Sequence, residues 1–380
     1  MSLVLNDVAK FMTSKIEVSE INETNYISTE NMISNKGGIT IASSLPDTKS
    51  VRKYLPNDIL INNIRPYFKK IWYSDMEGGC SNDVFVIRSK ENYDSKFLYY
   101  VLSSDDFFSY VMANAKGTKM PRGDKKAIQN YEVPNFSIDE QKRISFVLGE
   151  IDKKIEINKK INKNLFELSN VIYSDFIKSM DNNEQCHYIE LKELGNIVMG
   201  QSPKGESYNY DNIGLPLING AADYENGYLK AQKYTSDPKK TCNKNDLIFC
   251  IRATIGLLVV CDKKYCLGRG VAGITNINPI YKEYAFHLIN SSIENFKRAA
   301  TGSVISGISR KDIENIDVII PSSDEINKYH AVQKPIFDKL ENNRIEINNL
   351  IKLRDTLLPK LMSGEIDVSK INCDEILLVW

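Results

Sequence analysis

The chain has 380 residues, 42% of them hydrophobic and 26% charged, and its 49 Lys and Arg balance 49 Asp and Glu to a net charge of zero. This composition predicts a folded protein, and the length suits two domains rather than one core. It argues against a membrane-spanning segment and against a protein that coats nucleic acid indiscriminately, which would be basic throughout. Because the N-terminus lacks the long apolar stretch of a signal peptide, we expect a cytoplasmic protein with no membrane partner.

The first half of the chain predicts a mixed domain followed by a long helix. Apolar runs bounded by turn residues predict strands at 58–64, 83–89 and 130–136, and a helical pattern covers 96–115. Ser137 and Glu140 have the spacing of a capping box, which marks the start of a helix that runs to about residue 179. Its apolar residues keep a four-three spacing, as in a coiled coil, at Ile144, Leu148, Ile151 and Ile155, and resume at Leu165, Leu168 and Ile172.

The second half repeats this order. Strands are predicted at 246–252, 256–262 and 315–321, with a helix at 284–300. Ser322 and Glu325 form a second capping box, and the helix after it has four-three spacing at Ile336, Leu340, Asn343, Ile347, Leu350, Arg354, Leu357 and Leu361. Pro335 lies early in that helix, where we expect a restart or a kink. We expect the two long helices to pack on each other and to separate the two globular domains.

The two halves can be aligned as copies of one unit. "KGTKMPRGDKKAI" at 116–128 overlays "TGSVISGISRKDI" at 301–313, which sets Gly117 on Gly302 and Lys125 on Arg310. "LPNDILINNIRP" at 55–66 corresponds in the same way to "NKNDLIFCIRAT" at 243–254. A period near 185 residues is too long for a solenoid repeat and indicates a duplicated α+β domain. The two glycines are expected to shape loops rather than to bind a ligand.

Catalytic motifs are missing from the sequence. Its three histidines lie in separate segments, and no phosphate-binding loop or glycine-rich dinucleotide motif follows a strand. "NPIY" at 278–281 resembles an adenine-binding motif of methyltransferases but lacks its second proline, so we interpret it as a strand-to-helix turn. The seven cysteines are scattered and are predicted to be buried thiols rather than metal ligands. We therefore expect no metal site, no cofactor and no catalysis in this chain.

Two loops of each copy are instead rich in hydrogen-bond donors. "NNIRPYFKK" at 62–70 and "KGTKMPRGDKK" at 116–126 combine Asn, Arg and Lys with glycine-containing backbone. Arg and Lys suit the acceptor edge of guanine, Asn and Gln suit adenine, and further cations neutralise phosphates. Any single residue of this kind is commonly a solvated surface charge. Their occurrence in corresponding loops of both copies favours a surface that reads DNA.

Several segments in order resemble the specificity subunit of type I restriction-modification systems. They include "DILINNIRPYFKKIW" at 58–72, "GGCSNDVFVIR" at 78–88, "GQSPKGESYN" at 200–209, "CLGRGVAGI" at 266–274 and "LRDTLLPKLMSGEI" at 353–366. The resemblance implies two duplicated target-recognition domains separated by two long antiparallel coiled-coil helices, with pseudo-two-fold symmetry. The implied boundaries are 1–138 and 181–322 for the domains, 139–180 and 323–364 for the spacer helices, and 365–380 for a tail.

The resemblance also implies partners and site residues. Each domain would read one half of an asymmetric site in double-stranded DNA, and the helices would set the gap and dock two methyltransferase subunits, joined by two restriction/translocase subunits where the system has them. S-adenosylmethionine and ATP with Mg²⁺ would be cofactors of those partners. The DNA-binding residues expected in the first domain are Asn62, Arg65, Lys116, Lys119 and Arg122, and in the second Gln201, Ser202, Lys204, Asn219, Arg252, Arg269, Ser309 and Arg310. The expected partner-docking residues are Ile144, Leu148, Ile151, Ile336, Leu340, Ile347 and Leu350.

Two other functions remain open from the sequence. One is a stand-alone DNA-binding regulator that recognises split sites without an enzyme partner. The other is a coiled-coil adaptor whose domains bind proteins, for which the zero net charge is the best argument. A steep salt dependence of binding to duplex DNA would separate the DNA readers from the adaptor. An unrecognised nuclease or methyltransferase is the least favoured reading.

Overall fold

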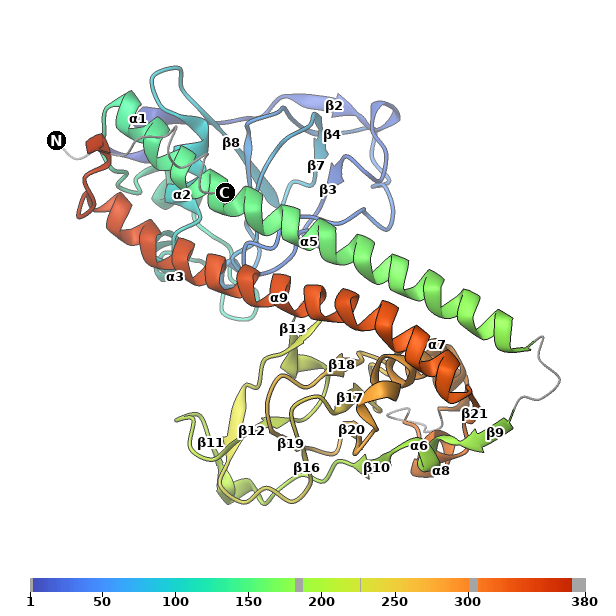
Figure 1. Ribbon diagram of the computed structural model, residues 1–380. Coiled ribbons are helices and arrows are strands. Elements are labelled where there is room, and N and C mark those ends of the chain that lie inside the picture. The colour runs from blue at the N-terminus through green and yellow to red at the C-terminus, as the bar shows by residue number, and fades with distance from the viewer. Residues whose placement is uncertain (1–2, 182–186, 226, 301–306, 371–380) are drawn as a thin grey trace. The chain divides into compact units, whose positions relative to one another are not determined.

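The protein is described by a computed structural model that covers residues 3–181, 187–225, 227–300 and 307–370. It divides into two compact units (Figure 1). Unit 1 consists of Met1–Lys159 and Ile345–Trp380, and unit 2 consists of Lys160–Arg344. The division falls inside both long helices, so that each helix contributes one half to each unit.

Unit 1 is built on two four-stranded sheets. The first has the order β1-β8-β5-β6, with β1 at Ala9–Phe11, β8 at Val84–Ser89, β5 at Ile59–Asn62 and β6 at Ile71–Tyr73, and all of its pairs are antiparallel. The second has the order β2-β4-β7-β3, with β2 at Lys15–Glu17, β4 at Ser50–Tyr54, β7 at Gly78–Cys80 and β3 at Tyr26–Ile27. In it β3 runs parallel to β7.

The strand β5 is buried on both faces, which explains its unbroken apolar run. Ile59 and Ile61 enter the core that includes helices α2 at Ser95–Leu102 and α3 at Asp105–Ala113, whereas Leu60 enters a second cluster with residues of β3, β4 and β7. The short helices α1 at Leu5–Val8 and α4 at Lys125–Gln129 complete the first core.

Unit 2 repeats this arrangement. Its first sheet has the order β10-β20-β17-β18, with β10 at Asn196–Met199, β20 at Val271–Thr275, β17 at Leu247–Cys250 and β18 at Val259–Val260. Its second sheet has the order β11-β15-β12-β19-β16, with β11 at Tyr208–Asn209, β15 at Lys233–Thr235, β12 at Leu215–Ile218, β19 at Tyr265–Leu267 and β16 at Thr241–Cys242. The pair β12 and β19 is parallel, like β3 and β7. The shared order of the first sheet and the shared parallel pair of the second confirm the predicted duplication of an α+β domain.

Further elements surround the sheets of unit 2. The hairpin of β13 at Tyr224–Glu225 and β14 at Tyr228–Leu229, and the pair of β9 at His187–Glu190 with β21 at Asp317–Ile320, lie outside the two larger sheets. The helices are α6 at Leu191–Leu194, α7 at Lys282–Ala299 and α8 at Arg310–Glu314. The strand-to-helix turn predicted at "NPIY" is confirmed, because Asn278 Oδ1 accepts a bond from Ile280 N (3.2 Å) between β20 and α7.

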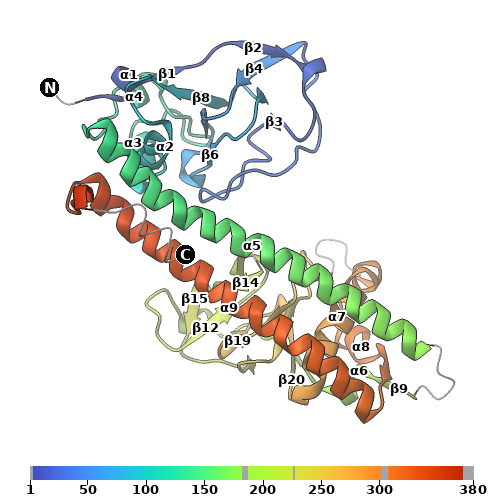
Figure 2. The ribbon, with the colours of Figure 1, turned by 45° about the horizontal axis from the view of Figure 1, so that its top comes forward.

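The long helices are α5 at Ile138–Asp181 and α9 at Ser323–Met362. Both capping boxes are confirmed: Ser137 N and Ser322 N each donate to the Glu three residues on, at 2.8 Å. The helix α9 is continuous through Pro335, so the expected restart is wrong. Figure 2 shows the two helices from a second direction.

The helix pair carries the predicted apolar seam with polar interruptions. In unit 1, Ile151 and Ile155 of α5 cluster with Ile347 and Leu350 of α9. In unit 2, Asn343 Nδ2 donates to Asn162 Oδ1 at 2.8 Å. Leu168, which the spacing assigned to the seam, is 49% exposed and faces away from it.

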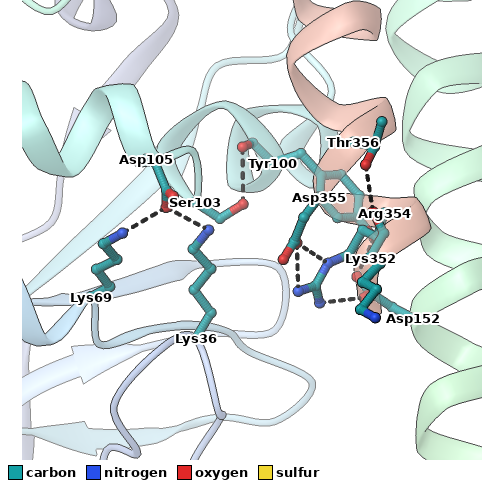
Figure 3. A network of polar contacts seen from close by, with 10 residues as sticks. All are labelled: Lys36, Lys69, Tyr100, Ser103, Asp105, Asp152, Lys352, Arg354, Asp355 and Thr356. Carbon is teal, nitrogen blue, oxygen red and sulfur yellow. Dashed lines mark hydrogen bonds and ion pairs between the residues drawn. The ribbon is translucent and has the colours of Figure 1, made fainter. Parts of the chain in front are cut away.

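A polar network holds each globular part to its helices. In unit 1, Asp152 of α5 accepts bonds from Tyr100 Oη of α2 (2.7 Å) and Arg354 Nη1 of α9 (3.0 Å), as Figure 3 shows. In unit 2 the corresponding helices meet at Ser169, whose Oγ lies 2.7 Å from His287 Nε2 of α7 and 2.6 Å from Gln333 Oε1 of α9. The junction of a shorter helix with α5 and α9 is thus held by an ion pair in unit 1 and by a neutral hydrogen-bond network in unit 2.

Two predicted elements of unit 1 are wrong. The helix expected at 96–115 is two helices, because Ser104 caps α3 by accepting a bond from Phe107 N at 3.1 Å and so ends the first helix. The segment 130–136 forms no strand. Glu132 makes only an isolated bridge to Val4, and Pro134 lacks the N–H that would continue the ladder.

Candidate nucleic-acid interface

The first candidate loop of unit 1 begins where β5 ends. Asn62 is only 2% exposed, and its Nδ2 donates to Ile64 O (2.6 Å) while its Oδ1 accepts from Thr29 Oγ1 (3.1 Å). In this structure its side chain holds the start of the loop and does not reach the surface. The sequence could not reveal this, because an Asn at a strand end reads as an exposed donor.

The second candidate loop lies directly against the first. Arg65 N donates to Pro121 O (2.8 Å), and Arg122 forms isolated bridges with both Ile64 and Lys116. The structure therefore brings Arg65, Lys116 and Arg122 together, and all three are exposed, as is Lys119.

Part of this positive charge is neutralised locally. Arg122 Nη1 lies 3.1 Å from Asp83 Oδ1, and Lys116 pairs with Asp124. Asp124 also caps α4 by accepting from Lys126 N at 2.8 Å, and Lys116 together with these backbone bonds lowers the pKa of its carboxyl. Exposed ion pairs of this kind contribute little to stability, so Arg122 or Lys116 can exchange its carboxylate partner for a phosphate at low free-energy cost. Within the described ranges, Arg65 and Lys119 form no ion pair.

In unit 2 the corresponding loops also meet. Arg252, which is exposed and follows β17, forms a bridge with Gly307, and Ile308 N donates to Ile251 O at 3.1 Å. Ser309 caps α8, since its Oγ accepts from Asp312 N (3.4 Å), and Arg310 Nε donates to Glu314 Oε1 at 2.6 Å. Gly302 lies outside the described residues.

The other candidates of unit 2 gather beside this edge. Arg269 Nε donates to Ser202 Oγ at 3.2 Å, and Gln201 N donates to Leu267 O at 2.8 Å. Asn219 packs so closely on the strand end that a Cβ added to Gly268 would lie 2.1 Å from its Oδ1. Gln201 and Arg269 are exposed, and Lys204, also exposed, follows on the same segment.

The two candidate surfaces occupy equivalent edges of the two units. Ser81 N donates to Ile27 O in unit 1 as Gly268 N does to Ile218 O in unit 2, both at 2.8 Å. Asn63 N donates to Asp83 O (2.8 Å) as Ile251 N does to Gly270 O (2.9 Å). These equivalences place Asp83 where unit 2 has Gly270. The backbone is shared, and the side chains that it presents differ.

Sequence reasoning missed several polar residues beside the surface of unit 1. They line a hollow of about 650 Å³ together with Arg65 and with Lys70 of the predicted donor-rich loop, and include Ser28, Thr29, Ser81 and Asp83. Lys70 Nζ donates to Thr29 O at 2.7 Å, and burial lowers the pKa of its amino group. For Ser81 and Asp83 the signal is the structural equivalence of "CSND" at 80–83 with "LGRG" at 267–270, which carries the candidate Arg269.

Most of the expected docking residues are buried. Ile144, Leu148, Ile151, Ile347 and Leu350 are at most 6% exposed inside unit 1, and Ile336 and Leu340 are half-buried in unit 2. Beyond the first residue, Ile138, the exposed large apolar residues described on α5 are instead Ile157, Ile161, Leu168 and Val171. In the part of the chain that the structure describes, no three His, Cys, Asp or Glu residues are placed to hold a metal ion. No helix there is long and apolar enough to cross a membrane.

The family model of the type I restriction modification DNA specificity domain matches the chain twice, over residues 4–167 and 183–354. The chain belongs to this family. The type I restriction enzyme MjaIX specificity subunit of Methanocaldococcus jannaschii is 25% identical over 312 residues, which cover 74% of this chain and 71% of that protein. The HindI specificity subunit of Haemophilus influenzae is 20% identical, with 95% of this chain and 98% of that protein covered.

A solved structure shares the fold of this specificity-family chain. The type I restriction-modification system S subunit from M. genitalium superimposes with a TM-score of 0.60 at 18% identity and covers 95% of this chain and 96% of that chain. The resemblance seen in the sequence is confirmed, and with it a role in DNA target recognition.

Proposed function

We propose that unit 1 and unit 2 each read one half of a bipartite DNA site through the two equivalent edges described above. The observation that supports this is the pairing of loops at the end of β5 and of β17, where a shared backbone carries different donors. Two readers with the same backbone and different side chains suit two half-sites of different sequence. The target is therefore asymmetric.

Individual roles follow from exposure. Arg65, Lys119 and Arg122 in unit 1, and Arg252 and Arg269 in unit 2, are the exposed cations that suit guanine or phosphate. Gln201 and Asn219 suit adenine, with Lys116, Ser202 and Lys204 beside them. Asn62, Ser309 and Arg310 act as positioning residues, because their side chains are engaged within their own loops and helices.

The partners follow from membership of the family. The chain itself is non-catalytic, and S-adenosylmethionine and ATP with Mg²⁺ belong to methyltransferase and restriction/translocase subunits. Two methyltransferase subunits dock on the long helices, through exposed faces rather than the buried seam. Ile157, Ile161, Leu168 and Val171 of α5 keep a heptad spacing and suit a partner helix.

A map of methylated adenines in the host genome, with and without the gene, tests this function. We expect a split asymmetric motif with a fixed gap that disappears when the gene is deleted. An unchanged map, together with salt-sensitive binding of the purified chain to duplex DNA, favours the stand-alone regulator. An unchanged map without DNA binding favours the protein-binding adaptor.

Replacing Arg122 by Ala tests the edge of unit 1. If Arg122 binds phosphate, the slope of the logarithm of the DNA-binding constant against the logarithm of the salt concentration becomes shallower by about one, and the recognised DNA motif does not change. If it reads guanine, one position of the motif relaxes instead. Lys153→Ala is the matched control, because Lys153 is an exposed cation on α5 paired with Glu150 at 3.5 Å. Unchanged affinity and motif in Arg122→Ala would remove this residue from the interface.

A further inference from the structure

The two candidate loops of unit 1 also carry an apolar tip. Tyr67, Phe68 and Met120 are 47%, 38% and 48% exposed, and the rings of Tyr67 and Phe68 lie 4.7 Å apart. Phe68 and Met120, from two different loops, line the same hollow. Exposed apolar side chains that cluster in this way indicate contact with a ligand more than singly scattered ones do.

The tip is held in a strained and well-supported conformation. The 3-10 turn η2 at Pro66–Phe68 is flanked by Arg65 (φ 49°) and Lys69 (φ 50°), both left-handed. Phe68 O accepts from Asn35 N at 2.8 Å, and Lys69 O accepts from Lys36 N at 2.9 Å. Such conformations persist only where the surroundings enforce them, and they are typical of functional sites.

Two lysines serve this support. The Nζ atoms of Lys36 and Lys69 lie 3.0 Å and 2.9 Å from Asp105 Oδ1, at the start of α3 (Figure 3). Bonds from Lys69 and Lys36 lower the pKa of the Asp105 carboxyl. Both lysines therefore tie the loop to the start of α3 through one carboxylate.

The charges beside the tip identify its occupant. Arg65 directly precedes the η2 turn, Lys119 directly precedes Met120, and both are exposed, as is Arg122 two residues further on. A ligand that is complementary to both the apolar tip and these cations presents apolar faces between rows of negative charge. Duplex DNA does so, since its stacked bases and thymine methyl groups lie between phosphates.

We propose that Tyr67, Phe68 and Met120 form an apolar wedge that presses on one base step of the half-site read by unit 1 and partly unstacks it. This rests on the proposed function and adds a reading mode that depends on deformability of the step rather than on hydrogen bonds. In unit 2 the equivalent loop, "ATIGLL" at 253–258, contains no aromatic residue. Its exposed large apolar side chain is Leu257 (40%), so the aromatic part of the wedge is specific to the half-site read by unit 1.

The test is selection of duplexes from a 60-bp pool with 20 randomised positions, using the full chain and Tyr67→Ala/Phe68→Ala. We expect loss of preference at two adjacent positions of one half-site and roughly tenfold weaker binding to the selected duplex, the loss of one stacking contact. The salt slope should not change, because neither residue is charged. Tyr210→Ala is the control, since Tyr210 is an exposed aromatic (72%) of unit 2 outside the candidate edge.

A spectroscopic readout and a milder variant complete the design. With 2-aminopurine at the affected step, binding of the unaltered chain should raise the fluorescence, and the double variant should not. Met120→Ser leaves the η2 turn intact and should cause a smaller loss of base preference at the same two positions. An unchanged motif in both variants, or a loss spread over the whole half-site in Met120→Ser, overturns the wedge. If the unaltered chain selects no duplex, the proposed function fails as well.

Discussion

A buried histidine makes the stability of unit 2 depend on pH. His287 is 1% exposed, its ring stacks on Tyr173 (5.2 Å between centroids), and its Nε2 lies 2.7 Å from Ser169 Oγ. Ser169 donates to Gln333 Oε1, so Ser169 Oγ accepts from His287 Nε2–H. Among the described residues, Nδ1 has no hydrogen-bond partner, and burial lowers the pKa of the imidazole to about 4. His287 is therefore neutral in the folded chain throughout the physiological range.

The size and sign of the effect follow from this shift. In the unfolded chain the imidazole titrates at about 6.5, so above that pH both states are neutral and His287 adds no pH dependence. As pH falls from about 6.5 to about 4, the unfolded state binds a proton that the folded state refuses, and stability declines. Two pH units within this window correspond to roughly 2–3 kcal/mol at 1.36 kcal/mol per unit.

Urea unfolding of the full chain and of His287→Gln, followed at pH 7.0, 6.0, 5.0 and 4.5, measures this contribution. Gln keeps a donor for Ser169 but cannot titrate. The free-energy difference between the two chains should move in favour of His287→Gln by about 2–3 kcal/mol from pH 7.0 to 4.5. Carboxylates that titrate in the same range affect both chains and cancel. A difference that stays constant with pH would refute the argument.

Two further substitutions test the interface and the seam. Gly268→Ala should weaken binding to the half-site of unit 2 roughly tenfold, because the new Cβ displaces Asn219. Gly205→Ala is the control, since a Cβ at Gly205 has no atom within 4 Å and should leave the affinity unchanged. Filter binding measures both affinities. Asn343→Leu should cost about 1 kcal/mol of unfolding free energy by stranding Asn162 Oδ1, and adding Asn162→Leu should recover most of it. Additive losses in urea unfolding would show that the two amides are not coupled.

Local signals in the sequence were reliable. Each capping box needs only four residues, and both begin a helix at the residue they mark. The run at 58–64 was recognisable as a strand because β5 is buried on both faces. The break between α2 and α3 was missed because the apolar pattern continues across it, and only the capping bond of Ser104 ends the first helix.

The candidate site was predicted at the level of loops but not of side chains. The duplication identified the loops that meet at each edge, as the bridges of Arg122 and Arg252 show. It could not reveal that Asn62 is turned inward, since the hydrogen bonds to Thr29 and Ile64 arise from tertiary packing. The apolar tip at Tyr67 was missed because an aromatic residue in a loop is more often packed than exposed.

The long helices show the same limit for apolar patterns. The helix α5 carries two heptad stripes, one buried on α9 with Asn158 among its apolar residues, the other exposed and interrupted by Asn164. The two stripes therefore have the same spacing and the same kind of polar interruption. Only packing within each unit decides which stripe is buried. On α9 the positions 185 residues after the exposed stripe hold Asn342, Glu346, Leu353 and Thr356. The two helices therefore share a buried seam but differ in their outer faces, so they present different surfaces to partners, just as the two units present different donors to the two halves of a DNA site.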